Sequence, residues 1–158
     1  MGDVMMWSAL AIVVLMLGTW VTSLAVKNAS IVDIVWGLGF VMVAWVSHVV
    51  GDGLSSRQWL LTIMTSVWGL RLGGYLWWRN HGKGEDFRYR AMRKHHGARF
   101  PIVSLYTVFL FQGLMMFVVS LPVQLGQDDP TPDLGAIAVL GVALWVIGLF
   151  FETVGDAQ

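Results

Sequence analysis

Residues 31–50 read IVDIVWGLGFVMVAWVSHVV, and this run of twenty residues decides the class of fold. Asp33 is its only residue with a formal charge at neutral pH when histidine is counted as neutral. The hydrocarbon core of a bilayer is about 30 Å thick, and a helix needs about 20 apolar residues to cross it. The run therefore predicts a transmembrane helix that carries one carboxyl group close to its first turn.

Four further apolar segments accompany this run along the chain, at residues 5–26, 58–78, 102–125 and 134–151. Of the 158 residues, 56% are hydrophobic and only 13% are charged, whereas soluble domains average about 25% charged residues. We therefore predict an all-α fold, a polytopic transmembrane helical bundle of about five spans that forms a single domain over residues 1–158. This composition excludes disordered, collagen-like and nucleic-acid-binding proteins. Because the chain has no cysteine, disulfides and thiolate metal sites are also excluded.

The basic residues are concentrated between the third and fourth predicted spans, in the loop at residues 79–101. Seven of the ten Lys and Arg residues lie there, namely Arg79, Lys83, Arg88, Arg90, Arg93, Lys94 and Arg99. Loops rich in Lys and Arg stay on the cytoplasmic side of a membrane. We predict a multi-pass protein of the bacterial inner membrane, with this loop in the cytoplasm and the N-terminus outside.

Several polar residues fall inside the predicted spans or at their edges, where they are costly and need a reason. They are Asp33, Arg71, Tyr75, Gln112, Glu152 and Asp156, and all of them map to the cytoplasmic half. The outer half offers only His48 and small hydroxyl groups. Two interpretations remain open: Asp33 and Arg71 form an ion pair that fixes helix packing, or these residues line a polar cavity under the basic loop that holds a charged cofactor.

The basic loop itself has two interpretations. Its arginines and lysines could hold phosphates through their side chains, but a basic segment next to a membrane ordinarily serves topology and anionic lipid headgroups. Gly82-Lys83-Gly84 lacks the spacing of a phosphate-binding P-loop. His95 and His96 are adjacent and have no further ligand at metal-binding spacing, so we predict no metal site.

A set of short motifs, taken together and in order, resembles a known family. The motifs are SIVDIVWG at residues 30–37, WGLRLGGY at 68–75, GEDFRY at 84–89, Gln112-Gly113, Leu121-Pro122 and Glu152-x-x-x-Asp156-x-Gln158. In this set the chain resembles the bacterial branch of the steroid 5-alpha-reductase family. The resemblance covers essentially the whole chain. It implies a membrane enzyme that uses NADPH to reduce a carbon–carbon double bond in a lipophilic, steroid-like enone.

The resemblance also implies roles for individual residues. Asp33 falls where the reductases have a glutamate that contacts the substrate carbonyl, and Trp68 falls where a tyrosine partners that glutamate. Arg71 and Tyr75 match a pair that contacts the cofactor. The motif formed by Glu152 and Asp156 is similar to an Asn-x-x-x-Asp cofactor motif. An ionised aspartate cannot donate a hydrogen bond to a carbonyl, so Asp33 would act when protonated or through a neighbouring donor such as Trp36 or Trp68.

Other functions remain open at this point. The family continues past the last motif through further spans, so we expect the chain to be the N-terminal part of a longer enzyme and to be inactive alone. Membrane methyltransferases that use S-adenosylmethionine share this kind of architecture and give a second enzymatic hypothesis. A non-catalytic membrane subunit or a small transporter is the third. The expected partners are a lipophilic small molecule and membrane lipids, with no nucleic acid.

Overall fold

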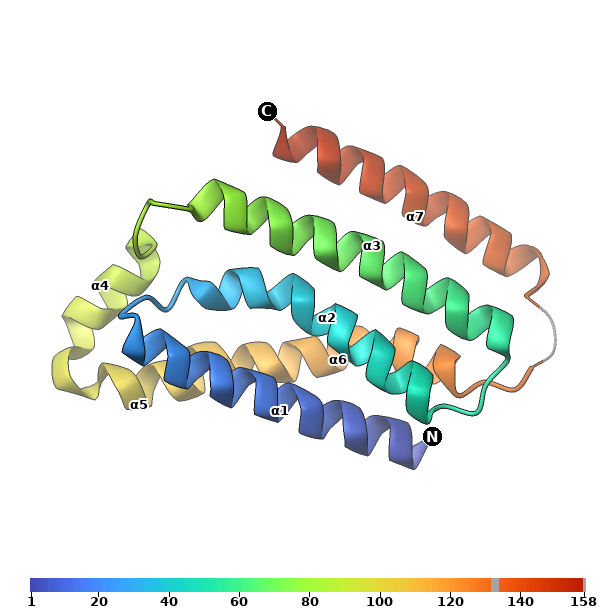
Figure 1. The fold of residues 1–158 in the computed structure, drawn as a ribbon, viewed down its shortest axis with the longest axis horizontal. Coiled ribbons are helices and arrows are strands. Elements are labelled where there is room, and N and C mark those ends of the chain that lie inside the picture. The colour runs from blue at the N-terminus through green and yellow to red at the C-terminus, as the bar shows by residue number, and fades with distance from the viewer. Residues whose placement is uncertain (132–133, 158) are drawn as a thin grey trace.

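The computed structural model describes residues 1–131 and 134–157, and it consists of helices joined by short turns (Figure 1). The long helices are α1 (Gly2–Ala25), α2 (Ile31–Val50), α3 (Ser55–Asn80), α6 (Phe111–Gln127) and α7 (Gly135–Asp156). The shorter elements between α3 and α6 are α4 (Phe87–His96), the 3-10 turn η1 (Gly97–Arg99), α5 (Phe100–Ser104) and the π-helical turn η2 (Leu105–Leu110). No strand occurs among the described residues, so the predicted all-α class is confirmed.

Four helical stretches are long and apolar enough to cross a membrane: α1, α2, the stretch Phe87–Gln127 and α7. α3 is not in this set, although it has 26 residues. It carries Arg57, Arg71 and Arg79, which lower its hydropathy. It nevertheless runs alongside α2, with α7 on its other side (Figure 1). The fold is therefore a helical bundle, as the sequence predicted, but four of its described stretches are apolar enough to cross a membrane where about five spans were predicted, and α3 is a fifth long helix that is less apolar.

The α2–α3 contact depends on glycines that leave no room for a side chain. A Cβ atom on Gly37 would lie 2.6 Å from the carbonyl oxygen of Gly69, and one on Gly69 would lie 2.5 Å from that of Gly37. Gly73 extends the same face of α3 toward α2. Small residues let membrane helices approach closely, so this seam fixes which face of α3 meets α2.

The predicted basic loop is largely helical. α3 continues to Asn80, and α4 occupies ten of the residues between the two spans. In Figure 1, α4 lies at the left-hand end of the bundle, beside the start of α2 and steeply inclined to the long helices. The basic segment therefore forms a folded cover over the end of the bundle that also holds Asp33 and Arg71.

The opposite end of the bundle is more polar inside than the sequence analysis indicated. Gln124 and Gln127 are fully buried, and the Gln127 amide donates to the Thr62 hydroxyl at 2.8 Å. The same hydroxyl lies 3.0 Å from His48 Nδ1, and the Gln58 amide donates to the Gln127 carbonyl at 2.9 Å. The expectation that the outer half holds only His48 and small hydroxyls was wrong, because Gln58, Gln124 and Gln127 are buried there.

Candidate functional site

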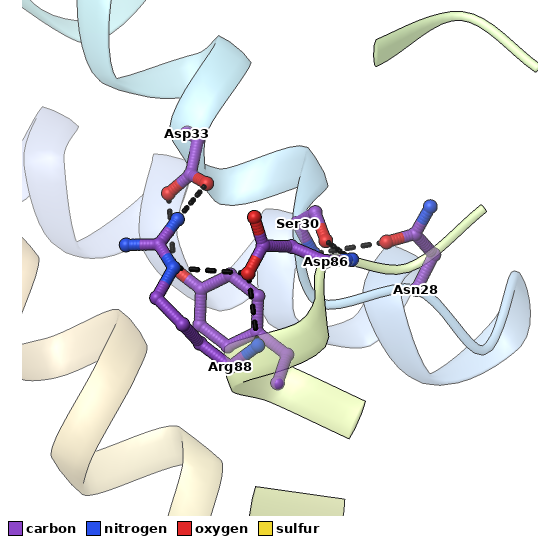
Figure 2. A network of polar contacts seen from close by, with 6 residues as sticks. Asn28, Ser30, Asp33, Asp86 and Arg88 are labelled. Carbon is purple, nitrogen blue, oxygen red and sulfur yellow. Dashed lines mark hydrogen bonds and ion pairs between the residues drawn. The ribbon is translucent and has the colours of Figure 1, made fainter. Parts of the chain in front are cut away.

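Asp33, on the first turn of α2, is the centre of a polar network (Figure 2). Its Oδ1 accepts a hydrogen bond from the Tyr89 hydroxyl at 2.9 Å, and its Oδ2 accepts one from Arg88 Nη2 at 3.2 Å. The Asp33 side chain is 22% exposed and that of Arg88 is 57% exposed. An ionised carboxylate only accepts hydrogen bonds, and both neighbours present donors, so the geometry suits an ionised Asp33.

The start of α4 is built to hold Arg88 against Asp33. Asp86 is the N-cap residue of α4 and accepts the backbone N–H of Arg88 at 2.9 Å, a role that aspartate fills well. The same oxygen accepts Arg88 Nε at 2.9 Å. Asp86 is itself fixed, because its backbone N–H donates to the Ser30 hydroxyl at 2.6 Å. Hydrogen bonds from Arg88 lower the pKa of Asp86 below its usual value.

Glu85 ties the same turn to the start of α2. Its carboxylate accepts the Ala29 backbone N–H at 2.8 Å and two hydrogen bonds from Arg93, at 2.8 and 3.1 Å. The Arg93 guanidinium also lies 4.1 Å from the centre of the Phe100 ring. Burial raises the pKa of Glu85, but the hydrogen bonds from Arg93 and Ala29 outweigh it, and the net pKa is lowered. Two of the seven basic residues, Arg88 and Arg93, are thus neutralised by neighbouring carboxylates.

A cleft of about 480 Å³ opens beside this network, between α2, α3 and α6. Its polar lining residues are Asp33, Arg79, Arg88 and Gln112, and its apolar ones are Trp36, Leu72, Leu76, Phe111 and Met115. Gln112 also reaches the Tyr89 hydroxyl with its side chain. The cleft thus combines hydrogen-bonding groups with a mostly apolar wall, which is the composition of small-molecule sites in general.

Arg71 forms a second cluster, between α3 and α7. Its Nη1 lies 2.7 Å from Asp156 Oδ2 and its Nη2 lies 2.5 Å from Glu152 Oε1. Trp68 Nε1 donates to Glu152 at 2.9 Å, and the Tyr75 hydroxyl donates to the backbone carbonyl of Asp156 at 2.8 Å. No described residue of α7 is buried, so these contacts supply its polar attachment to the bundle.

The structure separates residues that the sequence analysis brought together. The suggested Asp33–Arg71 ion pair does not form, because Asp33 binds Arg88 and Arg71 binds the two α7 carboxylates. Trp68 likewise donates to Glu152 rather than to Asp33. The reason is helix geometry. α2 packs on the Gly69 face of α3, and residue 71 lies roughly 200° further round a helix with 3.6 residues per turn. Gln158, the last residue of the final motif, lies outside the described residues.

Arg88 and Tyr89 were not predicted as the partners of Asp33, although both stand in the motif at residues 84–89. Asp86 directly before Phe87 was a usable signal for the start of a helix, because aspartate is a preferred N-cap residue. His95 and His96 contact each other edge to face, with ring centres 4.7 Å apart. In the part of the chain that the structure describes, no group of His, Cys, Asp and Glu is placed to hold a metal ion.

In a comparison with protein families, residues 19–158 match the family described as "Protein of unknown function (DUF1295)". The chain belongs to this family. Searches of curated proteins and of solved structures find no match. The matched region of this DUF1295 member contains the cleft and both polar clusters, and it begins within the second half of α1.

Proposed function

We propose that this DUF1295 protein is a membrane-embedded reductase that uses NADPH to reduce a carbon–carbon double bond in a lipophilic enone. The cleft is the observation that carries the proposal. The cleft has a volume of about 480 Å³ and four polar and five apolar lining residues. It therefore suits a lipophilic molecule whose polar atoms are grouped at one end. The resemblance to steroid 5-alpha-reductases points in the same direction.

The polar lining residues suggest how the reaction would be assisted. As the double bond of an enone is reduced, negative charge develops on the carbonyl oxygen, and fixed donors aimed at that oxygen lower the barrier. Asp33 accepts from Tyr89 and Arg88, so an ionised Asp33 serves as a positioning residue. We assign the donor role to Arg88 and Gln112, which line the cleft, in place of Asp33, Trp36 or Trp68.

The residues around Arg71 fit one part of a dinucleotide. With one guanidinium and two carboxylates, the cluster has a net charge of −1, which suits hydroxyl and amide groups and disfavours phosphates. Arg71 Nε is buried and has no hydrogen-bond partner among the described residues, so a ligand oxygen that displaced its cover would satisfy this donor. NADPH, when bound, would supply the hydride, and a proton from water would complete the reduction of the double bond. Arg71, Tyr75, Glu152 and Asp156 would orient its uncharged ribose and amide groups.

Cofactor binding tests this assignment. Arg71→Ala in the complete protein should weaken NADPH binding by about 1.5–3 kcal/mol, the contribution of a hydrogen bond to a charged group, while the fold is retained. Arg57→Ala is the matched control, because Arg57 also pairs with an aspartate, Asp129, but at the opposite end of the bundle. Unchanged NADPH affinity in Arg71→Ala, or an equal loss in Arg57→Ala, would contradict the assignment.

The reaction is tested separately. Purified protein in nanodiscs should oxidise NADPH in the presence of a panel of lipophilic enones, with one saturated product formed per NADPH consumed. Transfer of a methyl group from S-adenosylmethionine without NADPH oxidation would support the methyltransferase hypothesis instead. Binding of neither cofactor would favour a non-catalytic membrane subunit.

A further inference from the structure

Arg79 differs from the other arginines that face the cleft or the clusters, because its charge is not neutralised by a direct partner. Arg88 contacts Asp33 and Asp86, and Arg71 contacts two carboxylates. Within the described residues Arg79 has no ion pair, and its guanidinium lies 5.5 Å from the centre of the Tyr75 ring. It is exposed and lines the cleft.

A contact with the Tyr75 ring restricts the position of the Arg79 guanidinium. The Tyr75 ring below the guanidinium is anchored, because its hydroxyl donates to the Asp156 carbonyl at 2.8 Å. Residues 75 and 79 are also one helical turn apart, where side chains on a helix meet. A guanidinium offers five N–H donors in a planar fork that matches a carboxylate or a phosphate. Arg79 is therefore held at the cleft with its donors available.

Arg88 adds a further donor at the same cleft. Its Nε is used by Asp86 and its Nη2 by Asp33, and Figure 2 shows the other terminal nitrogen pointing away from both carboxylates. The charged lining residues are Arg79, Arg88 and Asp33, and Asp86 next to them also pairs with Arg88, so the four charges sum to zero. The preference for an anionic group therefore rests on the donors of Arg79, which has no ion pair among the described residues, and not on an excess of positive charge.

The apolar lining residues of the cleft indicate the chemistry of the rest of the ligand. Trp36, Leu72, Leu76, Phe111 and Met115 line the cleft, and burial of apolar surface against them contributes about 25 cal/mol per Å². A small inorganic anion would leave this wall uncovered. A molecule with an anionic head and an apolar body satisfies both parts of the lining.

We propose that the cleft binds an anionic amphiphile, with its carboxylate or phosphate on Arg79 and its apolar body against the wall formed by Trp36, Phe111 and Met115. The inference deepens the proposed function, on which it rests for the idea that the cleft holds the substrate. It narrows the substrate class from any lipophilic enone to one that carries an anionic group. Its test is a binding measurement, so it can fail or succeed independently of turnover.

The test compares labelled dodecanoate with labelled dodecanol, which has the same chain without the charge. The complete protein is placed in nanodiscs of phosphatidylcholine, and uptake by empty nanodiscs is subtracted. We expect dodecanoate to bind at least about ten-fold more tightly than dodecanol, equivalent to about 1.4 kcal/mol. Arg79→Gln should remove this preference, and Arg79→Lys should keep part of it. Equal affinities of the wild type for the two ligands, or an unchanged preference in Arg79→Gln, would overturn the proposal.

Two further variants serve as controls, one for general surface charge and one for the apolar wall of the cleft. Lys83→Gln removes an exposed charge from the neighbouring turn, outside the cleft lining, and should leave the preference unchanged. Met115→Trp fills the apolar wall and should weaken both ligands together. If Lys83→Gln has the same effect as Arg79→Gln, a general surface charge explains the result and the proposal fails.

Competitors identify the source of the anionic group. Displacement of dodecanoate by 10 mol% phosphatidylglycerol, with none by inorganic phosphate at equal concentration, assigns the cleft to a membrane lipid headgroup and supports the proposal. Absence of displacement by either supports a free lipid acid. Equal displacement by inorganic phosphate, or displacement by NADPH with no dodecanoate preference, shows a site for phosphate alone and overturns it. Lost NADPH oxidation with intact dodecanoate binding would instead count only against the reductase function.

Discussion

Substituting Asn for Asp33 keeps the size of the side chain and one hydrogen-bond acceptor but removes the charge. In the structure Asp33 accepts from the Tyr89 hydroxyl at 2.9 Å and from Arg88 at 3.2 Å. The Asn side-chain oxygen can still accept from Tyr89. The main loss is therefore the charge interaction with Arg88, which retains its hydrogen bond to Asp86 at 2.9 Å.

The exposure of the two side chains sets the magnitude. Arg88 is 57% exposed and Asp33 is 22% exposed, and exposed ion pairs contribute about 0–1 kcal/mol. We expect Asp33→Asn to lower the free energy of unfolding by about 1 kcal/mol, or about 2–4 °C in Tm for a chain of this size. A buried Asp33–Arg71 pair would instead have predicted a loss of roughly 3–5 kcal/mol.

Turnover should respond far more than stability. Without the carboxylate, Arg88 loses one of the two carboxylate contacts that position it at the cleft, and a displaced catalytic group can cost on the order of a hundred-fold in rate. Melting temperature in detergent and NADPH oxidation with an enone should be measured together. Asp129→Asn is the matched control, since it also removes a carboxylate from an arginine, Arg57, at the opposite end. A stability loss near 4 kcal/mol, or equal turnover loss in both variants, would refute this reasoning.

Three further predictions concern packing, topology and pH. Gly69→Ala places a Cβ 2.5 Å from a carbonyl oxygen of α2 and should lower the free energy of unfolding by about 1–3 kcal/mol. Gly74→Ala is the control, because open space surrounds Gly74, and it should leave the stability unchanged. Equal melting temperatures of the two variants would contradict the close approach of α2 and α3. A topology reporter fused near Lys94 should read cytoplasmic and one near Asp129 periplasmic; the opposite pattern would reverse the orientation. The pKa of Glu85 is lowered from 4.5 in the folded protein, so its carboxylate should stabilise the fold above pH 4.5 and lose this effect as the pH falls through the folded-state pKa. Glu85→Gln should therefore be as stable as the wild type only in acid. Parallel acid-unfolding profiles of the two proteins would contradict this prediction.

The sequence determined the class of fold and the asymmetry of charge. Each predicted span lies in helical structure, although the one at residues 102–125 runs through α5, η2 and α6. Apolar runs of about 20 residues leave few alternatives in a bilayer, where every backbone polar group must be satisfied internally. The number of Lys and Arg residues in each loop also predicted which end of the bundle is basic. Some residues of the candidate site could be predicted from the sequence, since Asp33 and Arg71 are charged groups inside apolar runs and Glu152 directly follows one.

Only the tertiary structure decided which of these charges meet. Pairing depends on the faces that the helices present, and the Gly37–Gly69 contact turns Arg71 away from α2 and toward α7. Arg88 reaches Asp33 because a turn and a short helix fold back over the end of the bundle, so that residues 55 positions apart bind each other. Periodicity and composition describe one helix at a time, and they hold no information on the rotation of one helix against another. That rotation is set by side-chain packing across the whole bundle, which is why the ion pairs and the cleft emerged only in three dimensions.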